Sequence, residues 1–314
     1  MRLRLTSVRY EADQIVSLEF ADPTGAPLPP WGPGAHLEIR LPSGLIRHYS
    51  LCGDPARADR YRVAVLRVAA GRGGSREIHD TLRVGTVLEV SAPRDTFALA
   101  EADHHLLIAG GIGVTPILTM AEHLAARGHP SWRLVYGGRS RDAMAFGDRV
   151  ARLPEGRAEV VCQDERGLPD LETAVAELPD GAHVYCCGPA PMIENATGLC
   201  ARRPDLVLHT ERFAAAPARP AATEDGAFEV ELAESGQVLK VPADRSVLDV
   251  VREVLPDVAY SCESGFCGTC ETGLVSGAAE HRDDLLTEAE RDAQRSMMIC
   301  VSRARPGERL VLRL

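Results

Sequence analysis

The chain has 314 residues, 45% of them hydrophobic, which is enough for two or three domains with ordinary cores. Its formal net charge of −10 argues against nucleic acid as a partner. No apolar run approaches the length of a membrane span, and the alternating start of the chain is unlike a signal peptide, so we expect a cytoplasmic protein with no membrane partner.

Residues 1–100 are predicted to form a small antiparallel β-barrel. Short segments that alternate between apolar and polar residues begin at Arg2, Ile15, His36, Tyr61 and Thr86. Turns rich in Gly and Pro separate them, which is typical of an all-β domain.

Two stretches of this barrel carry residues suited to a phosphate and an aromatic ring system. Arg47, Tyr49 and Ser50 stand near the end of one strand, where arginine can neutralise a phosphate and tyrosine can cover a ring. The loop 71–75 offers consecutive backbone N–H groups and a hydroxyl to an anion, and a helical stretch is expected to follow from Arg76. An ordinary strand terminus and a flexible glycine turn are the alternatives. The candidate phosphate-binding residues are Arg47, Gly73, Gly74 and Ser75.

Residues 101–213 change to alternating strands and helices, which predicts an α/β domain with a parallel sheet. Strands are expected at 106–109, 132–136, 159–162 and 183–187. Thr115 is a candidate N-cap with Pro116 in the first helical position, and Gly128 is expected to end that helix.

Two loops of this domain suit a dinucleotide. Gly111 and Gly113 lie between a strand and a helix N-terminus, where a pyrophosphate can approach, although the pattern differs from the Rossmann G-x-G-x-x-G fingerprint. A tight turn without phosphate is the alternative. Cys187, Gly188 and Pro189 close another strand, so the Cys187 thiol is either inert packing or lies against a nicotinamide.

Residues 214–227 are rich in Ala and Pro and are predicted to form a linker to a third domain at 228–314. A hairpin is expected around residues 234–236. Ser246 and Asp249 resemble a capping box for a short helix.

The spacing of four cysteines gives the strongest chemical signal. Cys262, Cys267, Cys270 and Cys300 follow the pattern C-x4-C-x2-C…C, which is typical of a plant-type [2Fe–2S] cluster. A structural zinc site is the alternative, but zinc usually shows paired C-x2-C knuckles and this chain has one. Of the five other cysteines, Cys52, Cys162, Cys186 and Cys200 are expected to be structural, whereas Cys187 keeps its two interpretations. Thiols stay free or bind metal in the cytosol.

Together these segments resemble the phthalate dioxygenase reductase family, a branch of the ferredoxin–NAD(P) reductase superfamily that includes the vanillate O-demethylase reductases. The resemblance covers almost the whole chain, in the motifs 47–52, 71–75, 109–116, 184–189, 209–213 and 261–270. It implies a multidomain protein with a flavin-binding antiparallel β-barrel, an α/β parallel-sheet nucleotide domain and an α+β ferredoxin domain of the β-grasp type.

The resemblance also implies roles for single residues. Arg47 and Ser75 would contact the phosphate of FMN, Tyr49 would pack on its ring with Ser50 near N5, and Phe213 would shield the other ring face. Ser50 and Cys187 would be the catalytic residues. The nucleotide-binding residues would be Gly111, Gly113, Thr115, Pro116, Cys187, Gly188 and Pro189.

The expected function is the reductase component of a multicomponent oxygenase. NADH would supply a hydride to FMN, and single electrons would leave through the [2Fe–2S] cluster to a Rieske-type oxygenase or demethylase. A reductase that supplies a cytochrome P450 is one alternative, and a scaffold protein with zinc and an empty flavin domain is another. Arg139 and Arg141 leave open a preference for the 2′-phosphate of NADPH.

Overall fold

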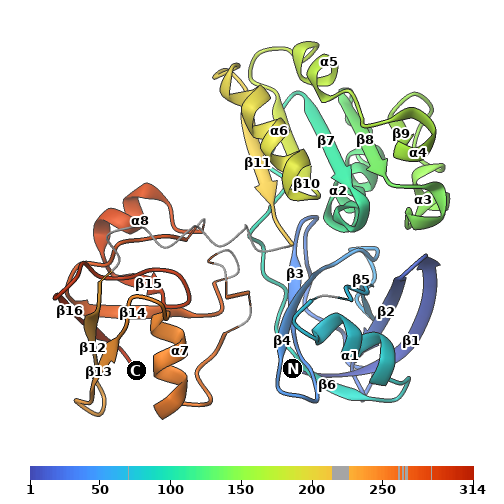
Figure 1. Ribbon diagram of the computed structural model, residues 1–314. Coiled ribbons are helices and arrows are strands. Elements are labelled where there is room, and N and C mark those ends of the chain that lie inside the picture. The colour runs from blue at the N-terminus through green and yellow to red at the C-terminus, as the bar shows by residue number, and fades with distance from the viewer. Residues whose placement is uncertain (70, 214–225, 261, 264, 266–267, 284) are drawn as a thin grey trace. The chain divides into compact units, whose positions relative to one another are not determined.

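The structure, a computed structural model, describes residues 1–69, 71–213, 226–260, 262–263, 265, 268–283 and 285–314. The chain falls into two compact units, Met1–Phe213 and Ala214–Leu314 (Figure 1). Most of the predicted linker, residues 214–225, lies outside the described residues. In the part of the chain that the structure describes, no helix has both the length and the apolar character needed to cross a lipid bilayer.

The first unit begins with a six-stranded antiparallel sheet that closes into a barrel. Its strand order is β4-β3-β6-β1-β2-β5, and a bridge between Leu51 and Val63 joins its two edges. Buried residues alternate with exposed ones, because successive side chains of a strand point to opposite faces. In β1, for example, Leu3 and Leu5 are buried, and the residue between them is exposed. The strands are β1 (Arg2–Ala12), β2 (Ile15–Ala21), β3 (His36–Arg40), β4 (Ile46–Ser50), β5 (Tyr61–Leu66) and β6 (Val87–Val90).

One helix, α1 (Gly74–Thr81), lies between β5 and β6. It begins two residues before the expected start at Arg76. Gly73 precedes it with a φ of 85°, a backbone conformation that glycine adopts without strain. The glycine loop therefore runs directly into the first turn of α1.

The rest of the first unit is a five-stranded parallel sheet with the order β11-β10-β7-β8-β9. The chain moves from β7 outward to β8 and β9, then returns to β10 on the other side of β7. The strand order therefore reverses between β7 and β10, and ligands of open α/β sheets bind outside the carboxyl ends at such a point. The strands are β7 (His105–Gly110), β8 (Trp132–Gly138), β9 (Ala158–Cys162), β10 (His183–Cys187) and β11 (Val207–Glu211). Strand β11 was not among the predicted strands.

Helices cover both faces of this sheet. Helix α2 packs on the face that carries Leu107 and Tyr185, whereas α5 and α6 cover the face of Leu106 and Val184. The helical elements are η1 (Gly111–Gly113), α2 (Val114–Ala126), η2 (Arg141–Ala143), α3 (Gly147–Val150), α4 (Gln163–Arg166), α5 (Leu171–Ala176) and α6 (Ala190–Ala201).

The prediction that Thr115 caps α2 is wrong. The helix begins at Val114, and the Thr115 hydroxyl donates a hydrogen bond to the carbonyl oxygen of Ile112 at 3.0 Å instead of accepting one from a backbone N–H. The single turn η1 continues directly into α2, so no separate cap is needed. The expected end is confirmed, because Gly128 has a φ of 65° just after the last turn.

The barrel and the parallel sheet share one hydrophobic core. Ala12, Ile15 and Cys52 of the barrel pack in the same buried cluster as Val114 and Ile117 of α2. The Arg149 guanidinium also donates a hydrogen bond to the carbonyl oxygen of Cys52 at 2.6 Å. Burial of apolar surface between them makes residues 1–213 one packed unit.

The second unit holds a mixed sheet of order β13-β12-β16-β14-β15 with helices α7 and α8. The predicted hairpin is present between β12 and β13, with Gly236 at a φ of 68°. The predicted capping box is also present, since Ser246 and Asp249 bond each other's backbone N–H groups. The elements are β12 (Phe228–Leu232), β13 (Val238–Val241), α7 (Val247–Val254), β14 (Glu271–Ser276), α8 (Glu288–Ala293), β15 (Ser296–Met298) and β16 (Arg309–Leu312).

Candidate functional site

The two loops at the switch point of the parallel sheet are pressed together. A Cβ atom on Gly113 would lie 2.2 Å from the carbonyl oxygen of Cys187, and one on Gly110 would lie 2.5 Å from Cδ of Pro189. Glycine is therefore required at both positions by the packing of one loop on the other. Gly111 is different, because nothing lies within 4 Å of a Cβ there and its φ is 53°.

The predicted nucleotide-binding residues differ in their exposure to solvent. Gly111 and Gly188 are half-buried and Pro189 is exposed, so these three are accessible at the switch point. Thr115 and Pro116 are buried in the first turn of α2. Gly111 and Ile112 are thus the partly exposed residues near the helix start.

Ser50, Cys187 and Glu211 come together although they are far apart in the sequence. The Ser50 hydroxyl donates to Oε2 of Glu211 at 3.4 Å, and Sγ of Cys187 lies 4.0 Å from the same oxygen. Cys187 and Glu211 are paired residues at the carboxyl ends of β10 and β11. The barrel and the parallel sheet therefore place one polar cluster at the switch point.

The cluster is poorly solvated. Desolvation raises the pKa of Glu211 to about 8, and the negative charge of Asp95 adds to the rise, while the hydrogen bond from Ser50 opposes it. Burial and the neighbouring Glu211 also raise the pKa of Cys187 well above its ordinary value. Both shifts favour the protonated, uncharged form of the group.

Sequence analysis did not single out Glu211. It lies within the motif 209–213, but its position carries no local pattern that points to Ser50. The pairing of β10 with β11 brings it beside Cys187.

Arg47 and the glycine loop are also adjacent, as their predicted shared role requires. The Arg47 guanidinium donates to the carbonyl oxygen of Arg72 at 2.8 Å, and a Cβ on Gly74 would lie 2.5 Å from Nε of Arg47. Ser75 stands in the first turn of α1, and its hydroxyl oxygen accepts a hydrogen bond from the N–H of Val68 at 3.1 Å.

The two aromatic candidates differ in their surroundings. Tyr49 packs against the barrel core, and burial raises the pKa of its hydroxyl. Phe213 is 41% exposed just after β11. An exposed ring at this point is free to cover a flat ligand.

Three of the four cysteines of the predicted cluster lie together in the second unit. Cys262, Cys270 and Cys300 are buried, and the Cys300 thiol is hydrogen-bonded with the sulfurs of both others, which raises its own pKa and lowers that of Cys270. Cys267 lies outside the described residues. Gly265 and Gly268, which flank Cys267, have φ values of 77° and 76°. The donor set and its glycine loop fit a cluster held by thiolates.

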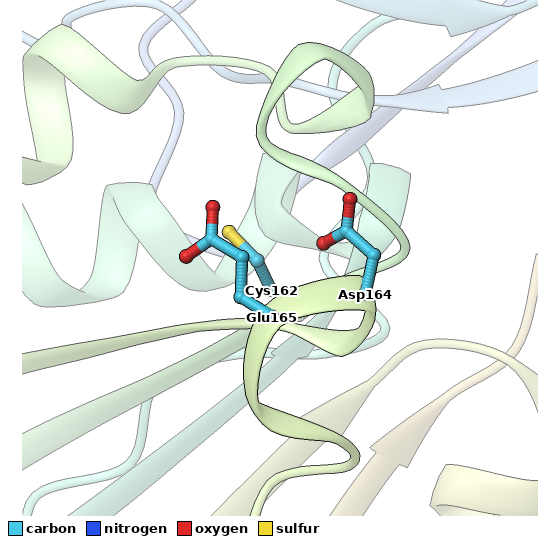
Figure 2. Close-up of side chains that lie close together, drawn as sticks. All are labelled: Cys162, Asp164 and Glu165. Carbon is cyan, nitrogen blue, oxygen red and sulfur yellow. The ribbon is translucent and has the colours of Figure 1, made fainter.

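The cysteines predicted to be structural are buried free thiols: Cys52, Cys162, Cys186 and Cys200. One of them neighbours two carboxylates at the end of β9, where Figure 2 shows Cys162, Asp164 and Glu165 side by side. Their possible donor atoms lie within 4.8 Å of one another, and both carboxylates are exposed. Exposed acidic groups of this kind are common without a metal ion.

Comparison with known proteins agrees with this architecture. A model of the oxidoreductase NAD-binding domain matches residues 107–197, and a model of the 2Fe-2S iron-sulfur cluster binding domain matches residues 230–305. The phthalate dioxygenase reductase of Burkholderia cepacia is 41% identical over 319 residues, which cover 100% of this chain and 97% of that relative. This chain belongs to the phthalate dioxygenase reductase family. The vanillate O-demethylase oxidoreductase of Pseudomonas sp. (strain HR199 / DSM 7063) is 40% identical over 308 residues, covering 96% of each chain.

Two solved structures extend the comparison. A structure of phthalate dioxygenase reductase, described as modular for electron transfer from pyridine nucleotides to [2Fe–2S], matches with a TM-score of 0.75 and 39% identity, covering 100% of this chain and 98% of that one. An intact type IV self-sufficient cytochrome P450 monooxygenase matches with a TM-score of 0.87 and 39% identity. This chain is covered completely there but spans only 41% of that longer chain.

The family membership decides between the alternatives left open by the cysteines. All four cysteines fall within the region matched by the 2Fe-2S domain model. The chain is accordingly an iron–sulfur oxidoreductase with a nicotinamide-nucleotide domain, and the zinc and scaffold alternatives are excluded.

Proposed function

We propose that this chain is the reductase component that carries electrons from NADH through FMN and its [2Fe–2S] cluster to a Rieske-type oxygenase or demethylase. The observation that carries the proposal is the convergence of Ser50, Cys187 and Glu211 at the switch point of the nucleotide domain. Whole-chain relatives support the proposal, since they include dioxygenase reductases and demethylase oxidoreductases.

The barrel residues are assigned to the flavin. Arg47, with Gly73, Gly74 and Ser75, would bind the FMN phosphate, because a cation and a helix N-terminus face the same loop. Tyr49 would pack on the ring, and Ser50 would donate to its edge. FMN supplies the conversion of a two-electron hydride into single electrons.

The sheet residues are assigned to the nicotinamide nucleotide. Gly111 at the start of η1 would line the pyrophosphate path, and the buried Gly113, Thr115 and Pro116 would hold that turn in place. Cys187, Gly188 and Pro189 would hold the nicotinamide. Glu211 would keep a proton on its carboxyl below a pH of about 8, so that the cluster of Ser50, Cys187 and Glu211 would carry no negative charge where hydride transfer is proposed. Phe213 would cover the flavin in the absence of nucleotide.

NADH is the proposed electron donor rather than NADPH. Asp164 and Glu165 stand after β9, at the same carboxyl edge of the sheet (Figure 2). Glu165 pairs with Arg141 at 3.5 Å. Two carboxylates would repel the 2′-phosphate of NADPH, and the Arg141 pair lowers the cationic charge left to attract it. Comparison of kcat/KM for the two nucleotides tests this preference.

A cytochrome P450 is the second candidate acceptor. The match to a self-sufficient P450 monooxygenase favours it, because a module of this architecture covers about two fifths of that chain. A cytoplasmic location is proposed as well, since none of the eight cysteines in the described ranges forms a disulfide.

Reconstitution tests the proposal. The purified chain, NADH and a Rieske oxygenase should form hydroxylated or demethylated product, and a P450 in place of the oxygenase separates the two candidates. A shortened chain that ends at Phe213 should still reduce ferricyanide with NADH but should not drive the oxygenase. Equal oxygenase turnover by both chains would show that the cluster is not in the path.

A further inference from the structure

Two described glycines of the cysteine loop, Gly265 and Gly268, lie against residues between β14 and α8. A Cβ on Gly265 would lie 2.9 Å from Cα of Asp283, and a Cβ on Gly268 would lie 3.0 Å from Cδ2 of Leu285. These glycines stand on either side of Cys267 in the sequence. Asp283 and Leu285 thus form a wall against the described glycines of the ligand loop.

Asp283 places a carboxylate in this wall with no access to water. Its side chain is 0% exposed. Oδ2 accepts hydrogen bonds from the N–H groups of Leu285 and Leu286 at 3.2 and 2.8 Å, and the Ser302 hydroxyl donates to Oδ1 at 3.4 Å. Every one of these partners is a hydrogen-bond donor, which matches the acceptor oxygens of a carboxylate.

The positive groups beside Asp283 are not in hydrogen-bonding geometry with its carboxylate. Nη2 of Arg291 lies 3.9 Å from Oδ2 and donates instead to the main-chain oxygen of Asp283 at 2.6 Å. Nδ1 of His281 lies 3.7 Å from Oδ1 and is buried without a hydrogen bond, while its Nε2 is 3.0 Å from Nε2 of Gln294. The Asp283 carboxylate is therefore held by backbone and hydroxyl donors, and neither neighbouring cationic side chain is hydrogen-bonded to it.

We propose that Asp283 is a residue that tunes the [2Fe–2S] cluster and holds its reduction potential low. A buried anion acts through a medium of low dielectric constant, where charges interact far more strongly than in water. Reduction adds one electron to the cluster, so a nearby negative charge disfavours the reduced state, and local charge is one of the factors that set such potentials. The inference rests on the proposed function, because it requires the cluster to be bound by the four cysteines.

The test is an EPR-monitored redox titration of the full-length protein with its cofactors. Asp283→Asn keeps the size of the side chain and one acceptor oxygen but removes the charge. We expect the equilibrium constant for cluster reduction to rise about tenfold, which is about 59 mV for one electron. Arg291→Gln removes a neighbouring positive charge and should shift the potential in the opposite direction, by less, because this guanidinium is partly exposed.

Glu229→Gln is the matched control. Glu229 is an exposed carboxylate in the same unit, paired with Arg309, so water screens its charge and the potential should stay at the wild-type value. Asp283→Asn protein with full iron content and an unchanged potential would overturn the proposal.

If Asp283→Asn fails to retain the cluster, Arg291→Gln decides the question, and an unchanged or raised potential in that variant overturns the proposal. A different result would show that the proposed function itself is wrong. Wild-type protein without iron and without the EPR signal of a reduced [2Fe–2S] cluster would refute the cluster assignment itself.

Discussion

Replacement of Gly113 by Ala tests whether the two loops at the switch point are held at contact distance. Gly113 has a φ of −60°, which any residue adopts, so the substitution introduces no backbone strain. The added Cβ would lie 2.2 Å from O and 2.5 Å from C of Cys187, and 2.9 Å from N of Gly188. These are backbone atoms that no rotamer change can move aside.

The loops must therefore separate by roughly 1 Å, and overpacking of this kind costs about 1–3 kcal/mol. For a unit of this size that lowers the melting temperature by about 2–12 °C. A displacement of 1 Å at a reacting centre also costs on the order of 100-fold in rate, so NADH–ferricyanide activity should fall steeply. The EPR signal of the cluster in the second unit should be unchanged.

Gly198→Ala is the matched control for this variant. Gly198 lies in α6, exposed, with nothing within 4 Å of an added Cβ. Alanine is favoured over glycine in a helix, so this variant should be more stable by about 0.5–1 kcal/mol and fully active. Thermal unfolding followed by FMN fluorescence compares the two. Wild-type stability and activity in Gly113→Ala protein would refute the packing argument.

Three further variants address the other parts of the site. In Glu211→Gln protein, the gain in stability over wild type should grow between about pH 4.5 and 8, because the raised pKa of Glu211 makes the folded wild type lose stability as pH rises through that window. The gain in the free energy of unfolding is at most about 5 kcal/mol, and about 2 kcal/mol once screening by water is included. A difference in melting temperature between the two proteins that does not change with pH would contradict this prediction. Arg47→Ala should weaken FMN binding by about 10- to 100-fold, because a charge-assisted hydrogen bond contributes about 1.5–3 kcal/mol; an unchanged dissociation constant would disprove the phosphate assignment. Cys300→Ser should disrupt the cluster and spare FMN, as iron content and EPR will report; a fully loaded, normally reducible cluster would remove Cys300 from the ligand set.

Local patterns in the sequence were sufficient to predict the features that depend on residues close together in the chain. The spacing of Cys262, Cys267 and Cys270 predicts a cluster loop because ligands close in sequence must be close in space. Alternation predicted the barrel strands, and Ser246 with Asp249 predicted the start of α7, because strand faces and helix caps depend on residues only a few positions apart. The glycine loop was found for the same reason, although α1 begins inside it.

Only the tertiary structure decided which distant residues meet. Ser50 and Glu211 are separated by 161 positions, and strand pairing across the shared core brings them to 3.4 Å. The same holds for Gly113, whose lack of a side chain was attributed to phosphate approach but is required by contact with Cys187. Asp283 likewise has no sequence signal, because burial of its charge depends on how its segment packs behind the cysteine loop. Hydrophobic periodicity and ligand spacing depend on residues that are near one another in the sequence and can be read from it directly. Long-range contacts, in contrast, form only when the whole core is packed.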